Sequence, residues 1–115
     1  MKSNIIKDKS FKFAVDIVNL YKDLSNNKKE YVMSRQLLKS GTSIGANVRE
    51  AEFAQSRADF TNKMSISLKE ANETDYWLDL LHATEFLDAD QFKAYKPKAQ
   101  EMLRLLVSIV KTSKE

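Results

Sequence analysis

Two glycines and one proline in 115 residues are the feature that most limits what this chain can fold into. Sheet-rich folds need turn residues about every 8–12 positions, and this chain cannot supply them. Long helices with short connections remain. The length corresponds to one domain, and a composition of 43% hydrophobic and 30% charged residues argues against a disordered or membrane-spanning chain.

Apolar residues recur with the period of an α-helix in four segments of the chain. These segments span residues 10–24, 29–54, 57–86 and 88–112. Short connections make consecutive helices antiparallel, so the sequence predicts a single domain over residues 1–115, an all-α, up-down-up-down four-helix bundle. Ser10 is a candidate N-cap for the first helix, and Phe11, Ile17 and Leu24 are expected on its inward face.

Two helix starts carry a recognisable capping pattern. Ser56 precedes Asp59 by three residues, and Asp88 precedes Gln91 by three residues, as in a capping box. Pro97 lies inside the fourth helix, where its missing N–H predicts a kink or an unmade hydrogen bond.

Missing residue types narrow the possible functions. The chain has no cysteine, which excludes disulfides, thiolate zinc sites and cysteine nucleophiles. A single histidine, His82, excludes multi-histidine metal sites. We therefore expect no catalytic residues, no metal and no cofactor. The charged N-terminus is followed by no apolar leader, and no apolar run approaches the ~20 residues that span a bilayer, so a cytoplasmic protein without a membrane partner is expected.

Charge is distributed unevenly along the chain. Residues 1–63 carry twelve bases and seven acids, residues 64–92 carry one base and seven acids, and residues 93–115 carry six bases and two acids. The net charge is +3 and the pI is about 9.1. The two basic regions are candidate binding surfaces for nucleic acid, and the acidic block of residues 64–92 is a candidate binding surface for a basic protein partner.

Polar residues line the edges of two predicted helices. They form one stripe on the second helix and one on the third: Gln36, Ser43, Asn47 and Glu50, and Glu70 and Glu73. Because buried carboxylates are costly without hydrogen bonds, we expect Asn47 and Glu50 to pair with Glu70 or Glu73. We favour a structural role, fixing helix register, over a carboxylate metal site, since the chain contains no Glu-x-x-His motif.

Two further patches suggest self-association. Gly41 and Gly45 lie four residues apart, where another helix could approach closely; packing inside the bundle is the equal alternative. On the third helix, Ile66, Trp77 and Leu80 widen the apolar surface beyond one bundle face. Exposed strips of this kind mark interfaces, although Trp77 and Leu80 could instead form a broad core edge. We expect a homo-oligomer.

The residues also resemble a known family. The segments Ser43-Ile44-Gly45-Ala46-Asn47-Val48-Arg49-Glu50-Ala51 and Ser67-Leu68-Lys69-Glu70 resemble the bacterial four-helix-bundle proteins related to the 23S rRNA intervening-sequence protein. The resemblance covers about residues 11–110. This chain departs from the family pattern at Ala51 and at Ile66, where glycine is common.

The resemblance implies a non-enzymatic, left-handed bundle that assembles as a ring, commonly a homopentamer. Accessory proteins of diversity-generating retroelements look similar and are basic pentamers that bind a reverse transcriptase and nucleic acid. The motif residues matched here are core and register residues, so the resemblance carries no nucleic-acid contact to a particular position.

Three functions are compatible with the sequence. The first is a binding module for RNA or another nucleic acid, in which a ring multiplies a weak basic patch. Its candidate contacts are Lys7, Lys9, Lys12, Lys28, Lys29, Arg35, Lys39, Lys93, Lys96 and Lys98. The second is a protein-binding scaffold ring with no nucleic-acid role. The third, an enzyme or metal carrier using Asn47, Glu50, Glu70 and Glu73, is the least favoured.

Overall fold

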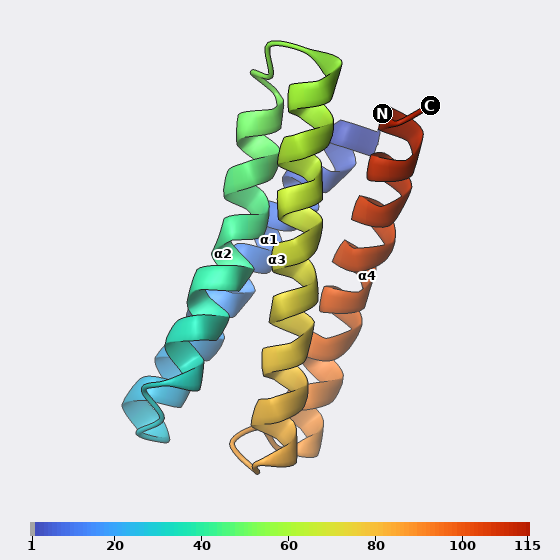
Figure 1. The fold of residues 1–115 in the computed structure, drawn as a ribbon. Helices are drawn as coiled ribbons and strands as arrows, with labels where there is room; N and C mark the ends of the chain where they lie inside the picture. Colours follow the sequence, from blue (N-terminus) through green and yellow to red (C-terminus); the bar gives the residue numbers. More distant parts are fainter. Residues whose placement is uncertain (1) are drawn as a thin grey trace.

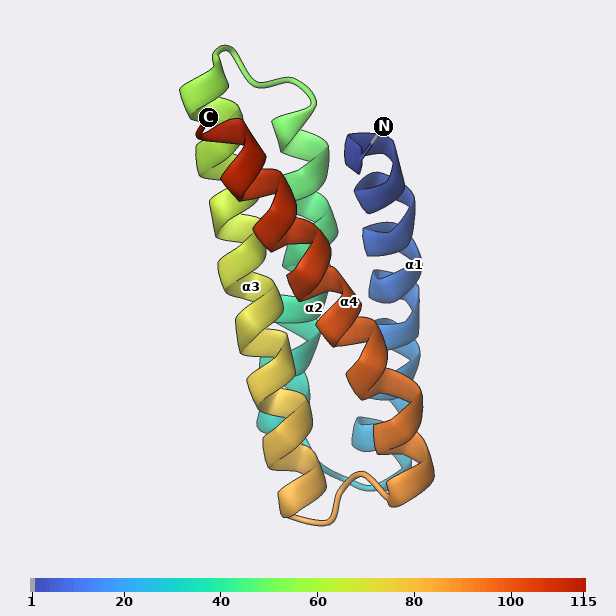
Figure 2. The same cartoon turned by 90° about the vertical axis from the view of Figure 1, so that its right-hand side faces the viewer.

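Four α-helices account for most of the chain. The computed structural model describes residues 2–115, with side chains placed from residue 4 onward. The helices are α1 (Lys2–Lys22), α2 (Met33–Ala51), α3 (Arg57–Ala83) and α4 (Ala89–Ser113), and the described residues contain no strand, which confirms the all-α prediction. Consecutive helices run in opposite directions and form a rod of 44 × 20 × 19 Å (Figure 1). Figure 2 shows α4 crossing the rod obliquely.

The first helix begins earlier than predicted. Ser10 is not an N-cap: it lies inside α1, 1% exposed, and its hydroxyl donates to the Lys7 carbonyl. Phe11 is also misplaced by the prediction, because the inward stripe of α1 passes through Ile6, Phe13 and Ile17 and leaves Phe11 outside. The buried positions follow one another at steps of four and three, and Phe11 lies one position off this stripe, so its side chain points away from the core.

The connection between α1 and α2 contains more structure than a simple polar turn. A π-helical turn, η1 (Asp23–Asn27), continues α1, and Lys29 then reverses the chain with a left-handed φ of 58°. The carboxylate of Glu30 accepts hydrogen bonds from the backbone N–H groups of Val32, Met33 and Ser34. Glu30 thus satisfies N–H groups that a helix N-terminus leaves without partners, and α2 begins at Met33.

Other helix ends follow the sequence signals. The Ser56 hydroxyl accepts from the Asp59 N–H at 3.0 Å, and Asp88 and Gln91 form the reciprocal bonds of a capping box. Both predicted caps are confirmed. Pro97 lies inside helix α4 with its side chain exposed, and the helix continues past it to Ser113.

A single apolar core runs the length of the rod, with contributions from all four helices. Its large, fully buried side chains include Ile17, Leu37, Ile44, Leu78 and Leu106. Burial of this kind supplies roughly 1.5–3 kcal/mol for each such side chain. Among the described residues, no helix combines the length and apolar character needed to cross a bilayer.

Candidate interaction surfaces

The polar stripes of α2 and α3 have other partners than predicted. The Asn47 amide donates to the Ser43 carbonyl within α2, and the exposed carboxylate of Glu50 pairs with Lys63 at 3.3 Å. Gln36 and Glu73 are exposed. The expected pairing of Asn47 and Glu50 with Glu70 or Glu73 is therefore corrected. The Asn47 amide lies within one turn of the Ser43 carbonyl, so it can form its hydrogen bond inside its own helix. For the Glu50 carboxylate, a lysine is a stronger partner than an amide or a second acid.

Small hydroxyl residues make the buried polar contacts between α2 and α3 instead. The Ser67 hydroxyl donates to the Ile44 carbonyl at 2.9 Å, and the hydroxyls of Thr74 and Ser40 lie 2.9 Å apart. All three hydroxyl side chains are fully or almost fully buried. Short side chains at seam positions allow two helices to approach closely, and their hydrogen bonds set the register. In the sequence, these three residues occur at the same steps of three and four as the apolar core residues of their helices, and this spacing indicates that they face the core.

Glu70 is the acid most affected by its surroundings. Partial burial raises the pKa of its carboxyl group, and the neighbouring charge of Glu73 raises it further, while Lys69 and Lys39 act in the opposite direction. The folded chain therefore binds this proton more tightly than the unfolded chain. Its ionised form costs stability above the raised pKa, and this cost disappears as pH falls to the ordinary value of 4.5.

Replacing Glu70 with glutamine is expected to raise the melting temperature at pH 7 and to change it little at pH 4. The reason is that the substitution removes a charge that folding desolvates, and at pH 4 this charge is already protonated. Thermal denaturation at the two pH values measures the difference. The control is Asp8→Asn, at an exposed acid, and a stabilisation of Glu70→Gln that is equal at both pH values would contradict the assignment.

The two glycines of α2 face α1. A Cβ atom built on Gly41 would lie 2.8 Å from Cγ2 of Ile17, and one built on Gly45 would lie 3.4 Å from the backbone oxygen of Ser10. Gly41 is buried in this contact. Of the two equal alternatives, packing inside the bundle applies to Gly41 and the oligomer interface does not, because α1 already occupies the space that the missing side chain leaves. Gly45 packs on α1 too, but it also lines a surface groove described below.

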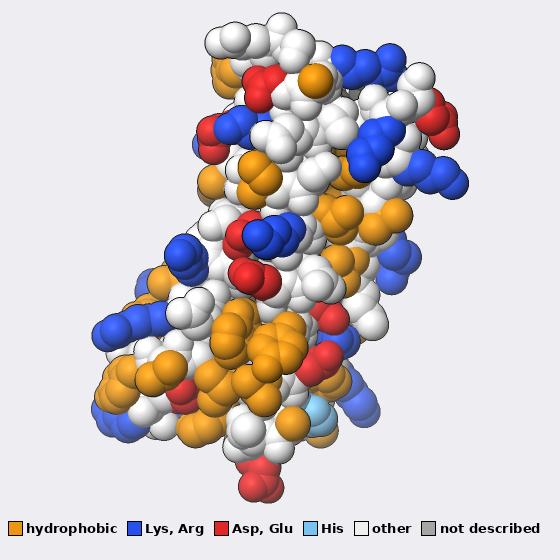
Figure 3. Space-filling view, in the orientation of Figure 1, with side chains coloured by type: hydrophobic (Ala, Val, Ile, Leu, Met, Phe, Trp, Pro, Cys, Tyr) orange, Lys and Arg blue, Asp and Glu red, His pale blue; other side chains and the backbone are white. Residues whose placement is uncertain are grey.

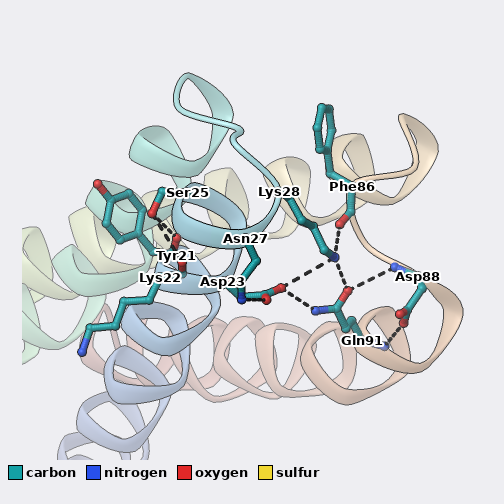
Figure 4. Close-up of polar contacts among 9 residues, drawn as sticks. All are labelled: Tyr21, Lys22, Asp23, Ser25, Asn27, Lys28, Phe86, Asp88 and Gln91. Atoms are coloured by element: carbon teal, nitrogen blue, oxygen red, sulfur yellow. Dashed lines mark hydrogen bonds and ion pairs between the residues drawn. The ribbon is translucent and has the colours of Figure 1, made fainter.

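One lysine predicted to contact nucleic acid is part of the fold. Lys28 lies at the end of the bundle where α1 and α3 end. Figure 4 shows its Nζ atom bonded to the Phe86 carbonyl, to Oε1 of Gln91 and to the Asp23 carboxylate. Hydrogen bonds from Asn27 and Gln91, together with the Lys28 charge, lower the pKa of Asp23. Lys28 ties the α1–α2 connection to the α3–α4 connection, and because its amine has these partners within the fold we leave it out of the nucleic-acid surface described below.

Four more candidate lysines are paired with acids across helices. One pair joins α1 to the C-cap of α2, two join α1 to α4, and the last joins α3 to α4. They are Lys7–Glu52, Lys9–Glu101, Lys98–Asp16, and Lys96 with both Asp75 and Asp79. Burial alone would lower the pKa of Lys96, but its bonds to the two aspartates outweigh this and raise it. These lysines contribute less to the attraction of a polyanion than their number suggests, since nearby carboxylates offset them.

The remaining candidates lie on exposed surface. Within the described residues, Lys12, Lys29, Arg35, Lys39 and Lys93 form no ion pair. Lys29 lies in the connection before α2, and Arg35 and Lys39 lie in the first two turns of this helix. No acid occurs between residues 31 and 49, and Tyr31 exposes half of its side chain beside them. We call Lys29, Tyr31, Arg35 and Lys39 the basic corner.

A groove of about 560 Å³ lies between the upper halves of α1 and α2. Small residues, among them Ala14, Gly45 and Ala46, line it together with Phe11 and Phe53, which are 56% and 81% exposed. The guanidinium of Arg49 sits 5.7 Å above the ring of Phe11. Exposed aromatic side chains beside a hollow are typical of an interaction surface. Sequence reasoning missed the groove because Phe11 was expected in the core.

A second apolar surface lies on the lower half of α3, where hydrophobic side chains gather in Figure 3. Tyr76 is exposed, and its ring meets that of Trp77 edge-on at 5.1 Å. Trp77 packs against the core with part of its surface, and Leu80 is half-buried. We call Tyr76, Trp77 and Leu80 the aromatic ridge. Ile66 is half-buried three turns away on the same helix.

The acidic side chains and His82 are the residue types here that could bind a metal ion. No group of three or more His, Cys, Asp or Glu side chains is placed to hold a metal ion among the described residues. The ring of His82 stacks on Phe92 with centroids 4.0 Å apart, a packing role for the one imidazole.

The sequence of the chain matches the model of one protein family. The model of the family described as 23S rRNA-intervening sequence protein matches residues 2–108. The chain belongs to this family. The match extends over all four helices, and the family resemblance predicted from the sequence is confirmed.

Relatives of this 23S rRNA-intervening sequence family protein include a solved structure. It is a crystal structure described as a protein with unknown function from the S23 ribosomal protein family of Bacteroides thetaiotaomicron, with 61% sequence identity and a TM-score of 0.94. The similarity covers 96% of this chain and 99% of that chain. No curated protein matches the chain at a significant level.

The segment that carries the family resemblance forms the α2–α3 contact. Ile44 is fully buried, and its carbonyl accepts the hydrogen bond from Ser67. The two residues that depart from the family pattern fit their sites: Ala51 is buried at the end of α2, and Ile66 lies half-buried on α3. The family motif is thus a packing motif in this chain.

Proposed function

We propose that the chain is a non-enzymatic module that assembles with itself into a ring and binds RNA through the basic corner. The observation that carries the proposal is a set of exposed bases at the start of α2: Lys29 in the preceding connection, and Arg35 and Lys39 in the acid-free stretch of the helix. None of the three forms an ion pair within the described residues. The family description, 23S rRNA-intervening sequence protein, supports RNA as the partner. The match of the S23 ribosomal protein family structure is consistent with the same assignment.

Assembly matters for binding because a single basic corner is weak. Three exposed charges neutralise few phosphates, and each phosphate contact contributes through the counterions that it releases. Several copies in one particle would present several corners to one RNA, and their joint affinity exceeds that of any one of them. The exposed ring of Tyr31 adds a surface on which an unpaired base can stack. Such a surface reads charge and shape, not sequence.

The proposal is tested by RNA binding across a salt series. The unchanged chain should bind a structured RNA at roughly 50 mM salt, with affinity falling steeply as salt rises. The double variant Arg35→Glu/Lys39→Glu should weaken binding at least about tenfold, equally for unrelated RNA sequences, because it replaces two phosphate contacts by two repulsions. Fluorescence anisotropy measures both effects.

A matched charge reversal serves as the control. Arg104→Glu/Lys111→Glu changes the net charge equally at exposed positions of α4 and should leave affinity within about twofold, since long-range charge effects are screened beyond about 10 Å. Equal losses in the two double variants would mean that net charge alone drives binding. No binding at low salt would refute the RNA role.

A scaffold ring without a nucleic-acid role is the second candidate. The exposed aromatic side chains favour it, since Phe11, Phe53 and Tyr76 are each more than half exposed. Phe11 and Phe53 share one groove and Tyr76 lies on α3, and RNA binding through the basic corner needs neither surface. Light scattering should give a mass several times 13.2 kDa under either function. An oligomer that binds no RNA would support the scaffold, and a clean monomer at micromolar concentration would refute both.

A further inference from the structure

We propose that copies of this chain join through two different surfaces: the groove between α1 and α2 of one copy receives the aromatic ridge of α3 of the next. The inference rests on the proposed self-assembly and names the contact that would produce it. It commits to a second copy of this chain as the occupant of the groove.

The shapes of the two surfaces are complementary. The groove is hollow, about 560 Å³, and its small residues Ala14, Gly45 and Ala46 leave room for large side chains. The ridge presents aromatic surface on the outside of α3, because Tyr76 is 57% exposed and its ring meets that of the half-buried Trp77 edge-on. Aromatic side chains inserted into a pocket are the commonest anchors of protein interfaces.

The charges of the two surfaces are complementary as well. Beside the groove, Lys7 and Glu50 already have partners, which leaves Arg49 stacked on Phe11 without a carboxylate within ion-pair distance among the described residues. Glu73 lies about one turn from the ridge and Glu70 about two turns, and the charge of Glu73 raises the electrostatic cost of ionising Glu70. Within the described chain, neither acid forms an ion pair with a base. If Arg49 of one copy faces these acids of the next copy, the unpaired positive charge and the unpaired negative charges neutralise each other.

The two surfaces lie at different heights along the rod. The contact of Ser40 with Thr74 places Trp77 level with about residue 37 of α2, about nine residues or ~14 Å below Ala46. A contact between unlike surfaces is heterologous, and it closes into a ring when the rotation permits. With this offset, the rods must be inclined to the axis of such a ring.

Pairs of engineered cysteines test the contact, and the chain has no cysteine of its own. Ala46→Cys places a thiol in the groove, and Glu73→Cys places one beside the ridge, both at exposed positions. One variant carries a tag so that its mixed dimer runs separately on a non-reducing gel. After oxidation with glutathione disulfide, the mixture should cross-link at least roughly tenfold more than Ala46→Cys mixed with Gln100→Cys, because the contact holds the thiols at high effective concentration.

Charge exchange gives an independent readout. Arg49→Glu and Glu73→Arg should each weaken assembly about tenfold or more in light scattering, and the double variant should recover it, because the pair is restored with opposite polarity. Circular dichroism checks that each variant keeps its helices. Recovery in the double variant is not expected if either residue acts only within its own copy.

The outcomes separate this contact from assembly itself. A monomeric wild-type chain refutes both the self-assembly and the contact. An oligomeric wild type without the mixed cross-link refutes the groove–ridge contact and leaves self-assembly standing. Strong cross-linking of Ala46→Cys with itself would show a two-fold contact between grooves and would overturn the proposal. The mixed cross-link, with neither variant cross-linking alone, supports it.

Discussion

Gly41→Ala is expected to destabilise the protein by a net ~1–2 kcal/mol, although alanine is the better helix former. The added methyl group would lie 2.8 Å from Cγ2 and 2.9 Å from Cγ1 of Ile17, and a β-branched side chain has no free rotamer in which to withdraw. The helices must therefore move apart or strain. Urea denaturation of the variant and the wild type measures the loss.

Gly45 supplies the matched control four residues further along the same helix. Its added Cβ would meet Ser10 at 3.4 Å, an ordinary van der Waals distance, so Gly45→Ala should stabilise by roughly 0.5–1 kcal/mol through helix propensity. In an Ile17→Ala background the cost of Gly41→Ala should vanish, since the two sites are coupled by direct contact. Equal stabilisation at both glycines would contradict the close approach of α1 and α2.

Glu30→Ala is expected to cost roughly 2–3 kcal/mol, an unusually large effect for an acid in a connecting segment. Its side chain accepts from three backbone N–H groups, at 3.1, 3.1 and 2.7 Å, and is 8% exposed. Without it, the first turn of α2 would bury N–H groups that lack partners. Chemical denaturation gives the loss, and amide hydrogen exchange at residues 32–34 locates it.

Two substitutions show whether the effect belongs to this cap. Glu30→Gln keeps an oxygen acceptor and should cost less than alanine. Glu52→Ala removes an acid from a partly exposed pair with Lys7 and should cost under about 1 kcal/mol. If Glu30→Ala behaves like Glu52→Ala and amide exchange stays slow, the cap contributes little to stability.

The cap also bears on where RNA can bind. A helix N-terminus attracts phosphate because its N–H groups and dipole favour negative charge. At the start of α2 the Glu30 carboxylate already occupies this position. The proposed RNA contact therefore uses the basic side chains of α2 and not its N-terminus, which is why the binding test changes Arg35 and Lys39.

Predictions based on local pattern agreed best with the structure. Helical periodicity and the scarcity of glycine and proline indicated four helices, and the caps at Ser56 and Asp88 needed only short-range signals. Helix starts without such a signal were misplaced. Glu30 caps α2 from three residues before its start, with a longer side chain than a typical N-cap residue, so residue type alone did not reveal it.

The sequence by itself determined the helical class, the core periodicity and the family, because these depend on spacing along one chain. The tertiary structure decided which exposed groups are free. Lys28 and Lys96 look like Lys29 in the sequence, yet the fold brings acids and carbonyls from distant helices to the first two and leaves the third in solvent. Likewise, Gly41 is covered by α1 while Gly45 reaches the groove. Charge pairing and close packing depend on which helix faces meet in space, and spacing along one helix does not specify its neighbour.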